Sequence, residues 1–220
     1  MTEIRANKIL IALKNVFSMP EWSSSARNPF ETLVATIISQ NTTGNNAAKA
    51  FERLSMKFRI TPEALANADE KEIGEALRVA GLYRNKAETL KRVSGIVLRE
   101  FHGSLDFVYS MSLEEARKSL MSLPGVGPKT ADVVLLFCAQ KPTIPVDTHV
   151  NRVSKRLRLA PENGDYDEVR MALQSLFASK DYLAVHVSLI TLGRRYCRAL
   201  KPLCSQCPVN ELCPSRCVEG

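Results

Sequence analysis

Signatures of helix N-termini recur along this 220-residue chain, whereas strand signatures do not. Asn28-Pro29-Phe30-Glu31 combines a capping side chain, a proline suited to the first helical position and a glutamate three residues after the cap. Apolar residues at helical spacing follow and predict a buried helix that ends near Ser39. Further starts are expected at Thr61-Pro62, Ser112 with Glu115, Asp147, and Asp165 with Glu168. Since no stretch alternates apolar and polar residues over a strand length, we expect an all-α protein of about ten helices.

The apolar content is sufficient for one large core or two smaller ones, because 45% of the residues are hydrophobic. Residues 3–17 are expected to form an additional helix whose apolar face includes Ile4, Leu10, Leu13 and Phe17. A weaker signal lies at Ala80-Gly81-Leu82-Tyr83, where a short glycine turn separates two helical patterns and is followed by Lys86.

The chain is basic, with 30 Lys+Arg against 23 Asp+Glu and a formal net charge of +7. This balance favours polyanionic partners, nucleic acid above all, although a basic surface without a specific partner stays open. No segment approaches the roughly 18 consecutive apolar residues of a membrane span, and the N-terminus lacks a secretory signal. We therefore expect no membrane partner and an intracellular location, cytoplasmic and nucleoid-associated if the source is prokaryotic.

The stretch LPGVGPKTADVV, residues 123–134, contains two glycines and two prolines within five residues. Gly125 and Gly127 permit positive φ and close backbone approach, while the prolines stiffen the turn. Backbone amides from Gly125 through Val126 to Thr130, at the start of the next helix, are predicted to point outward and can hold a phosphate. A plain turn between helices is the alternative, but the full pattern resembles the helix-hairpin-helix motif, which grips a DNA backbone independently of sequence.

Lys129 follows this turn directly, and its simplest role is one more phosphate contact. The following helix carries the chain about 16 Å away, and residues 141–146, extended by two prolines, can return up to about 20 Å. Asp147 can therefore lie beside Lys129, although its position also predicts a helix N-cap. Partial burial and the positive end of a helix favour loss of the lysine proton, which nucleophilic attack requires. We expect Asp147 to shuttle protons and to stabilise positive charge on a sugar.

Five of the six cysteines lie in the last 24 residues, an arrangement that favours metal over disulfides in a chain without a secretory signal. Cys197, Cys204, Cys207 and Cys213 are spaced C-x6-C-x2-C-x5-C. Zinc ribbons usually have two C-x2-C knuckles far apart, so this compact loop fits a 4Fe–4S cluster better, with zinc as the alternative. Arg194, Arg195, Arg198 and Lys201 make the loop basic and could contact phosphates. Cys138 is assigned to core packing, and Cys217 has no assigned role.

In this order and spacing, LPGVGPKTADVV, VDTHVNRVSKRL and the four-cysteine tail closely resemble the endonuclease III branch of the helix-hairpin-helix DNA glycosylases. The resemblance runs from Asn28 to Cys213 and implies two helical lobes that bind double-stranded DNA in a cleft. One lobe, residues 24–140, is implied to hold six helices and the hairpin. The other joins residues 1–23 to residues 141–220 and carries the cluster loop at 197–213. We expect the protein to act as a monomer.

The resemblance also implies a bifunctional reaction at a damaged base, most simply an oxidised pyrimidine, or at an abasic site. Lys129 attacks C1′ of a flipped nucleotide, the base leaves, and β-elimination cleaves the strand, with Asp147 assisting. Extrusion of the base costs a few kcal/mol and leaves a gap. In the family pattern, side chains at the positions of Asn41, beside Gln40, and of Leu82 fill this gap. Asn41 stands where bacterial members usually carry glutamine, which puts the preferred opposing base in doubt.

Simpler roles stay open for these residues, namely helix C-capping for Gln40 and Asn41 and core packing for Leu82. Two other functions also stay open. A monofunctional glycosylase for mismatched thymine, uracil or adenine is disfavoured by Lys129, since such relatives usually lack a lysine there. A non-catalytic iron–sulfur DNA-binding protein would use the glycines and cysteines but would give Lys129 and Asp147 no duty.

Overall fold

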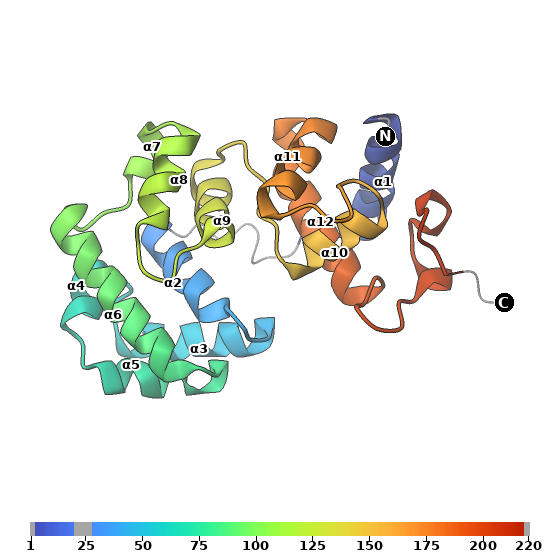
Figure 1. Ribbon diagram of the computed structural model, residues 1–220. Coiled ribbons are helices and arrows are strands. Elements are labelled where there is room, and N and C mark those ends of the chain that lie inside the picture. Colours follow the sequence, from blue (N-terminus) through green and yellow to red (C-terminus); the bar gives the residue numbers. More distant parts are fainter. Residues whose placement is uncertain (1–2, 20–27, 218–220) are drawn as a thin grey trace. The chain divides into compact units, whose positions relative to one another are not determined.

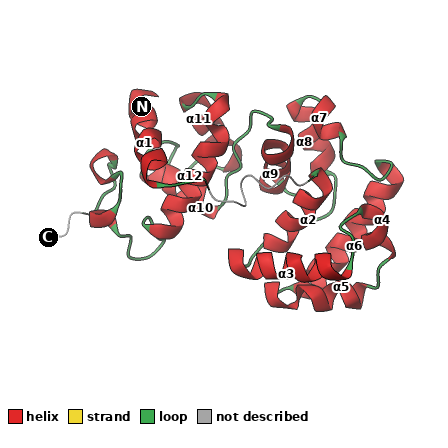
Figure 2. Ribbon diagram, turned by 180° about the vertical axis from the view of Figure 1, so that it is seen from behind, coloured by secondary structure: helices red, strands yellow, loops and turns green. Residues whose placement is uncertain are grey.

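The computed structural model describes residues 3–19 and 28–217. Within these residues it contains twelve α-helices and no β-strand (Figures 1 and 2), which confirms the all-α prediction. The number slightly exceeds the ten expected, partly because α7 (Phe107–Ser110) is a single turn. No described helix is both long enough and apolar enough to cross a membrane.

The chain divides into two compact units, Ala26–Gln140 and Met1–Ser25 with Lys141–Gly220. The boundary predicted between residues 23 and 24 lies outside the described residues. Eight α-helices belong to the described part of Ala26–Gln140, where six were expected, because the short α4 and α7 add to the longer ones. They are α2 (Pro29–Ser39), α3 (Gly44–Lys57), α4 (Pro62–Asn67), α5 (Glu70–Leu77), α6 (Tyr83–Glu100), α7, α8 (Leu113–Met121) and α9 (Pro128–Ala139), with a 3₁₀ turn η2 (Arg78–Ala80) before α6.

The core of Ala26–Gln140 is built around α2, which packs against α3, α6 and α9. Its Leu33, Val34, Ile37 and Ile38 are almost completely buried. Burying such a side chain contributes about 1.5–3 kcal/mol, so this one helix supplies a large part of the unit's stability. The predicted start is confirmed, since the Asn28 side chain accepts a hydrogen bond from the Glu31 amide at 2.8 Å.

The other unit contains four helices in its described residues, α1 (Glu3–Val16), α10 (Thr148–Arg156), α11 (Tyr166–Leu176) and α12 (Tyr182–Arg195). Three short 3₁₀ turns complete it, η3 (Ser179–Asp181), η4 (Cys204–Gln206) and η5 (Asn210–Leu212). Helix α12 packs against both α10 and α1. Its apolar middle is buried, and it ends at the start of the cysteine loop.

The predicted helix caps are present. Thr61 and Asp147 each accept a hydrogen bond from the amide three residues on, and Ser112 and Asp165 form complete capping boxes with Glu115 and Glu168. Ile4 was wrongly placed on the buried face of α1, because 68% of it is exposed. Ile4 precedes Leu10 by six residues, which is about 1.7 turns and rotates it off the face. The buried face of α1 consists of Ala6, Ile9, Leu10 and Leu13.

Candidate active site and iron–sulfur loop

The glycine hairpin connects α8 to α9 and depends on Gly125. This residue has φ 73°, and a Cβ atom there would lie 2.8 Å from the Thr89 methyl carbon on α6. Only glycine adopts this positive φ without strain and also leaves the space beside Thr89 free of a Cβ atom. Gly127 instead has an extended φ of −92° and open space where a Cβ would lie, and Pro128 occupies the first position of α9. The hairpin therefore presents a glycine surface to solvent at a helix N-terminus, where amides lack intrahelical acceptors.

Gln40 connects the end of α2 to the hairpin. Its Nε2 donates to the Gly125 carbonyl at 3.1 Å and to Thr130 Oγ1 at 3.3 Å, so three of the predicted DNA-binding residues meet here. The backbone of Gln40 also serves as the C-cap of α2, as the simpler prediction held. Val126 differs from its neighbours, because its side chain is buried and its amide donates to the Leu123 carbonyl. Neither the side chain nor the backbone amide of Val126 is therefore available for its predicted contact with DNA.

Asn41 and Leu82 are both exposed and both left-handed. Their φ values are 52° and 47°, and 58% of Leu82 is exposed to solvent. Core packing is therefore excluded as the role of Leu82. A left-handed conformation costs a residue with a β-carbon about 1–2 kcal/mol, less for asparagine, so the surrounding structure must impose it. Strained, exposed residues on short turns are typical of functional positions.

Lys129 occupies the second position of α9, directly after the hairpin, and is half-buried. Asp147 is the N-cap of α10, and its Oδ1 accepts a hydrogen bond from the Val150 amide at 2.7 Å. The structure thus assigns Asp147 the capping role that the sequence left open, while Oδ2 makes no hydrogen bond within the described residues. Lys129 belongs to Ala26–Gln140 and Asp147 to the other unit, so their approach stays a prediction.

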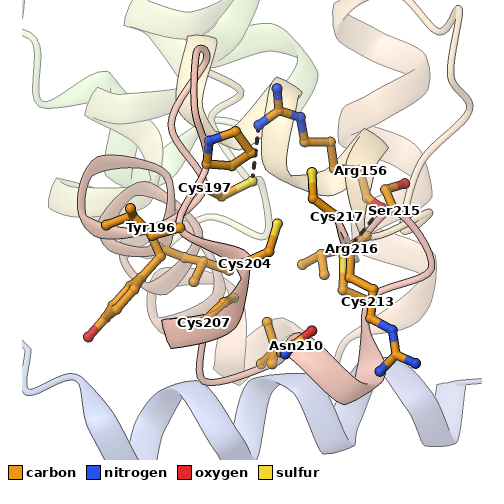
Figure 3. Close-up of a pocket in the computed structure, with 15 residues that line it drawn as sticks. Arg156, Tyr196, Cys197, Cys204, Cys207, Asn210, Cys213, Ser215, Arg216 and Cys217 are labelled. Carbon is orange, nitrogen blue, oxygen red and sulfur yellow. Dashed lines mark hydrogen bonds between the residues drawn. The ribbon is translucent and has the colours of Figure 1, made fainter. Parts of the chain in front are cut away.

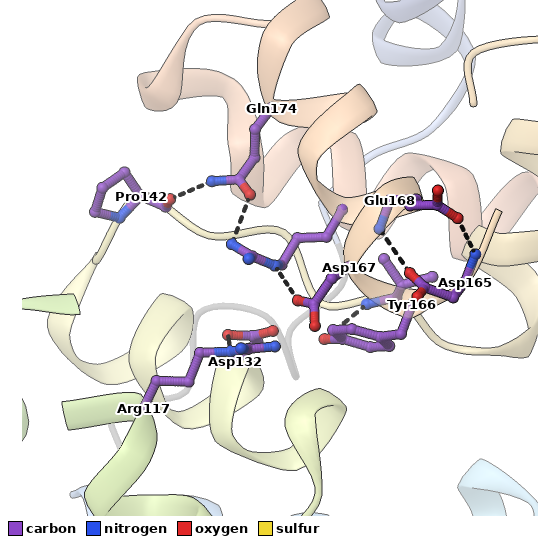
Figure 4. Close-up of polar contacts among 10 residues, drawn as sticks. Arg117, Asp132, Pro142, Asp165, Tyr166, Asp167, Glu168 and Gln174 are labelled. Carbon is purple, nitrogen blue, oxygen red and sulfur yellow. Dashed lines mark hydrogen bonds and ion pairs between the residues drawn. The ribbon is translucent and has the colours of Figure 1, made fainter. Parts of the chain in front are cut away.

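The segment that leads to Asp147 is fixed by side chains from α11 and α12. Gln174 donates to the Pro142 carbonyl at 2.6 Å, and the Val146 amide donates to the Tyr166 hydroxyl at 3.4 Å (Figure 4). The buried ring of His186 donates from Nδ1 to the Pro145 carbonyl at 2.9 Å, because a carbonyl only accepts. Sequence reasoning missed these contacts. The one available signal was a histidine inside the apolar run of α12.

His149 lies beside Asp147 on the first turn of α10. Burial lowers the pKa of His149, an effect that Asp147 opposes and that Arg152 and Arg194 reinforce. Arg152 NH2 lies 3.2 Å from His149 Nδ1, and since arginine only donates, Nδ1 must accept. A neutral imidazole therefore stands next to the capping carboxylate, and the positive charge nearby belongs to arginines.

The cysteine loop encloses a cavity of about 220 Å³ that Cys197, Cys204, Cys207 and Cys213 line together (Figure 3). Burial raises the pKa of the Cys207 and Cys213 thiols, so a bound metal would displace their protons. Among the described residues, no three Cys, His, Asp or Glu side chains converge on one metal ion. Four thiols spread around one cavity fit a cluster of several atoms better than the single zinc ion that the sequence left open.

Three arginines attach this loop to the helical body. Arg5 of α1 donates to the carbonyls of Leu157 and Leu212, both at 2.6 Å. Arg152 donates to the carbonyls of Cys197 and Gly193 at 3.0 Å. Arg156 donates to the carbonyls of Arg198 and Ala199, and its NH1 lies 3.5 Å from Cys197 Sγ (Figure 3). A loop with little regular structure is thereby positioned by charge-assisted hydrogen bonds to its carbonyls.

The basic residues around the loop, and the two remaining cysteines, are also placed. Arg194, Arg195, Arg198 and Lys201 are all exposed, which leaves them available to phosphates. Cys138 lies 3.1 Å from Thr32 Oγ1 and packs against the core of Ala26–Gln140, as predicted. Cys217 is exposed at residue level but lines the same cavity as the other four cysteines, and a hydrogen bond to Cys204 raises the pKa of its thiol.

Comparison with known proteins identifies the family. Residues 34–179 match the model of the HhH-GPD superfamily of base excision DNA repair proteins, and the chain belongs to this superfamily. Residues 197–213 match the iron–sulfur binding domain of endonuclease III. The cysteine loop is therefore the site of the 4Fe–4S cofactor predicted from the spacing.

Within the superfamily the similarity is to endonuclease III. The chain is 35% identical to the enzyme of that name from Sulfolobus acidocaldarius over 94% of this chain and 95% of the relative. It is 36% identical to that from Thermotoga maritima, over 84% and 83%. A solved structure of a trapped endonuclease III–DNA covalent intermediate matches with a TM-score of 0.84 and 32% identity, over 98% of this chain and 97% of that one. The resemblance stated from the motifs is confirmed.

Proposed function

We propose that this protein is a bifunctional DNA repair enzyme, a DNA glycosylase that also cleaves abasic sites as a lyase. The observation that carries the proposal is the match over 98% of the chain to an endonuclease III trapped covalently on DNA. A covalent enzyme–DNA intermediate requires a nucleophile. In this chain a half-buried lysine at the first turn of a helix, directly after a glycine hairpin, is suited to that role.

The proposed reaction assigns each step to a residue of the chain. Lys129 Nζ attacks C1′ as the bond from C1′ to the base breaks, and the base leaves with a proton. The C1′–O4′ bond then breaks as the nitrogen and C1′ form the double bond of a protonated Schiff base, and O4′ takes the proton that the attacking amine gave up. Removal of a C2′ proton expels the 3′ phosphate by β-elimination and cuts the strand. Asp147, through the oxygen not used for capping, is assigned the transfer of protons and stabilisation of positive charge on the sugar.

The 4Fe–4S cluster takes no step in this reaction. When bound, it supplies four strong cross-links and a redox-active centre, and it would be held by Cys197, Cys204, Cys207 and Cys213. Its role in this proposal is to fix the basic loop on which Arg194, Arg195, Arg198 and Lys201 are exposed. Those cations would contact the phosphates of double-stranded DNA on either side of the lesion.

The finer assignments concern substrate and assembly. Oxidised pyrimidines and abasic sites are the proposed substrates, and the protein is proposed to act as a monomer. Asn41 and Leu82 are the proposed side chains that fill the gap left by the extruded nucleotide. Their exposure on strained turns supports this assignment. A panel of duplexes that vary the damaged base and the base opposite it, assayed for strand nicking, would define the specificity that Asn41 confers.

Borohydride trapping tests the catalytic lysine. A Schiff base is reduced to a stable adduct, so the wild type should become covalently attached to a duplex that contains an abasic site. Lys129→Ala should form no adduct and should lose lyase activity by about a thousandfold or more. Lys118→Ala, which removes an exposed lysine of α8, is the matched control and should retain the adduct. An unchanged adduct in Lys129→Ala would overturn the assignment, and no adduct in the wild type would favour a monofunctional or non-catalytic protein.

Asp147→Asn separates capping from catalysis. Asparagine caps helices as well as aspartate does, so the free energy of unfolding should change by no more than about 0.5 kcal/mol. Removal of the charge should slow base excision by about 100-fold or more. Asp165→Asn makes the same change at the N-cap of α11 and should leave the rate unaltered. Equal rates in the two variants would show that Asp147 only caps its helix.

A further inference from the structure

Lys86 is a buried cation that the proposed reaction does not use. It lies on the first turn of α6, only 5% of it is exposed, and burial lowers its pKa. Its Nζ donates to the Ile38 carbonyl at 2.8 Å and to the Ala80 carbonyl at 3.1 Å. Burying an ammonium group is costly even when it is hydrogen-bonded, so two carbonyl contacts give little reason to place it there for stability alone.

The two carbonyls are close in sequence to the two strained residues. Ile38 lies in the last turn of α2, three residues before Asn41, and Ala80 ends η2, two residues before Leu82. Helix C-termini carry unsatisfied carbonyls and partial negative charge, which a cation satisfies. One amine therefore connects the bases of two turns, residues 40–43 and 81–82, which we call the wedge loops. In each loop the left-handed residue lies two or three positions after the anchored carbonyl.

The same helix also adjoins the hairpin. The methyl group of Thr89, three residues after Lys86, fills the space that a Cβ of Gly125 would need, and Gln40 in the first wedge loop donates to the Gly125 carbonyl. The wedge loops and the hairpin therefore form one connected set within Ala26–Gln140, with α6 as the common support. A shift of the Lys86 amine would change the spacing between the two wedge loops, although the buried amine itself would not contact DNA.

We propose that Lys86 is a positioning residue that sets the spacing between Asn41 and Leu82 and thereby the recognition of an extruded nucleotide in duplex DNA. This inference rests on the proposed function. A gap exists only where a base has been extruded from a duplex, so the wedge loops have no task on single-stranded DNA. Loss of the spacing should therefore impair duplex substrates and spare the reaction of the amine with a single-stranded abasic site.

The experiment measures the rate of borohydride trapping of an abasic site in duplex DNA and in single-stranded DNA. The quantity compared is the duplex rate divided by the single-stranded rate. In Lys86→Met this ratio should fall between about tenfold and a hundredfold, since misplacement by about 1 Å has effects of that size. Lys91→Met is a matched control, because Lys91 also lies on α6 and donates to two backbone carbonyls, those of Ala66 and Ala68. Ala66 lies in the last turn of α4 and Ala68 between α4 and α5, and neither carbonyl adjoins a wedge loop, so the ratio should be unchanged.

Two further variants keep the inference testable. Should Lys86→Met fail to fold, Lys86→Arg retains the charge and the donors but is longer, and its ratio should fall by a smaller factor. In a Leu82→Ala background, Lys86→Met should lower the ratio less than it does in the wild type, because coupled residues are not additive. A ratio unchanged in both Lys86 variants, or equally lowered in Lys91→Met, would overturn the inference. Absence of any adduct in the wild type would instead refute the proposed function.

Discussion

Leu82 offers a test in which two variants should differ in stability and yet lose activity alike. The residue is left-handed, with φ 47° and ψ 29°, and 58% of it is exposed. Replacement by alanine or by glycine removes the same exposed side chain, but only glycine also relieves the backbone. We therefore expect Leu82→Gly to be more stable than Leu82→Ala, although both should lose the proposed wedge and nick lesion-containing duplexes slowly.

The size of the difference follows from two opposing effects. Relief of the left-handed conformation should stabilise the glycine variant by about 1–2 kcal/mol. The greater freedom of glycine in the unfolded chain offsets about 0.4–1 kcal/mol of that gain. The net advantage of Leu82→Gly over Leu82→Ala is thus about 0.5–1 kcal/mol, which corresponds to a rise of about 1–4 °C in Tm for a chain of this length.

Thermal unfolding followed by circular dichroism measures this difference, and Met171 supplies the control. Met171 is also apolar and exposed, at 54%, but lies in the middle of the regular helix α11. There glycine should be less stable than alanine by about 0.5–1 kcal/mol, so the order of the two variants should reverse. The reasoning is refuted if glycine and alanine rank the same way at both positions, or if Leu82→Ala nicks a lesion-containing duplex as fast as the wild type.

Four shorter predictions concern the cofactor, the core, pH and salt. Cys207→Ser should lose most of the bound iron, whereas Cys217→Ser should retain it, as iron content per chain would show; equal loss in both would refute the four-ligand set. Arg117→Met should destabilise the protein by about 1–3 kcal/mol in urea unfolding, because it removes the Arg117 partner 3.1 Å from the completely buried carboxylate of Asp132. The pKa of His149 is lowered from 6.5 in the folded state, so the unfolded chain binds the proton more readily. The free energy of unfolding should therefore fall further in the wild type than in His149→Gln as the pH drops from 7.5 to 5.5. Equal losses in the two proteins would contradict this. Affinity for undamaged duplex should fall steeply between low and moderate salt, and a flat response would argue against phosphate contacts.

The parts of the fold that sequence predicts are those fixed by local chemistry. A capping side chain such as Asn28 or Ser112 satisfies amides within three residues of itself, so its effect can be read without knowledge of the rest of the chain. The cysteine spacing is equally local. Ile4 shows where local reasoning fails, because a single apolar residue at a helix start fits several faces and only packing selects one.

The parts that sequence could not predict are contacts between residues distant in the chain. His186 and Pro145 are 41 residues apart, and Gln40 and Gly125 are 85 apart. No pattern within a helical window records such pairs. Lys86 stands in an ordinary amphipathic helix, where a lysine normally faces solvent, and only the fold shows that its amine is buried between two helix ends.

Strain and anchoring explain each other in the wedge loops. A left-handed residue with a side chain is unfavourable in an isolated turn, so neither wedge loop would hold its shape unaided. The hydrogen bonds from Lys86 to the residues before each loop, and from Gln40 of the first loop to the hairpin, supply the missing constraint. The exposed side chains of Asn41 and Leu82 take no part in that constraint. Their identity can therefore change, and lesion preference with it, while the loops keep their spacing, whereas a change at Lys86 should impair every duplex substrate.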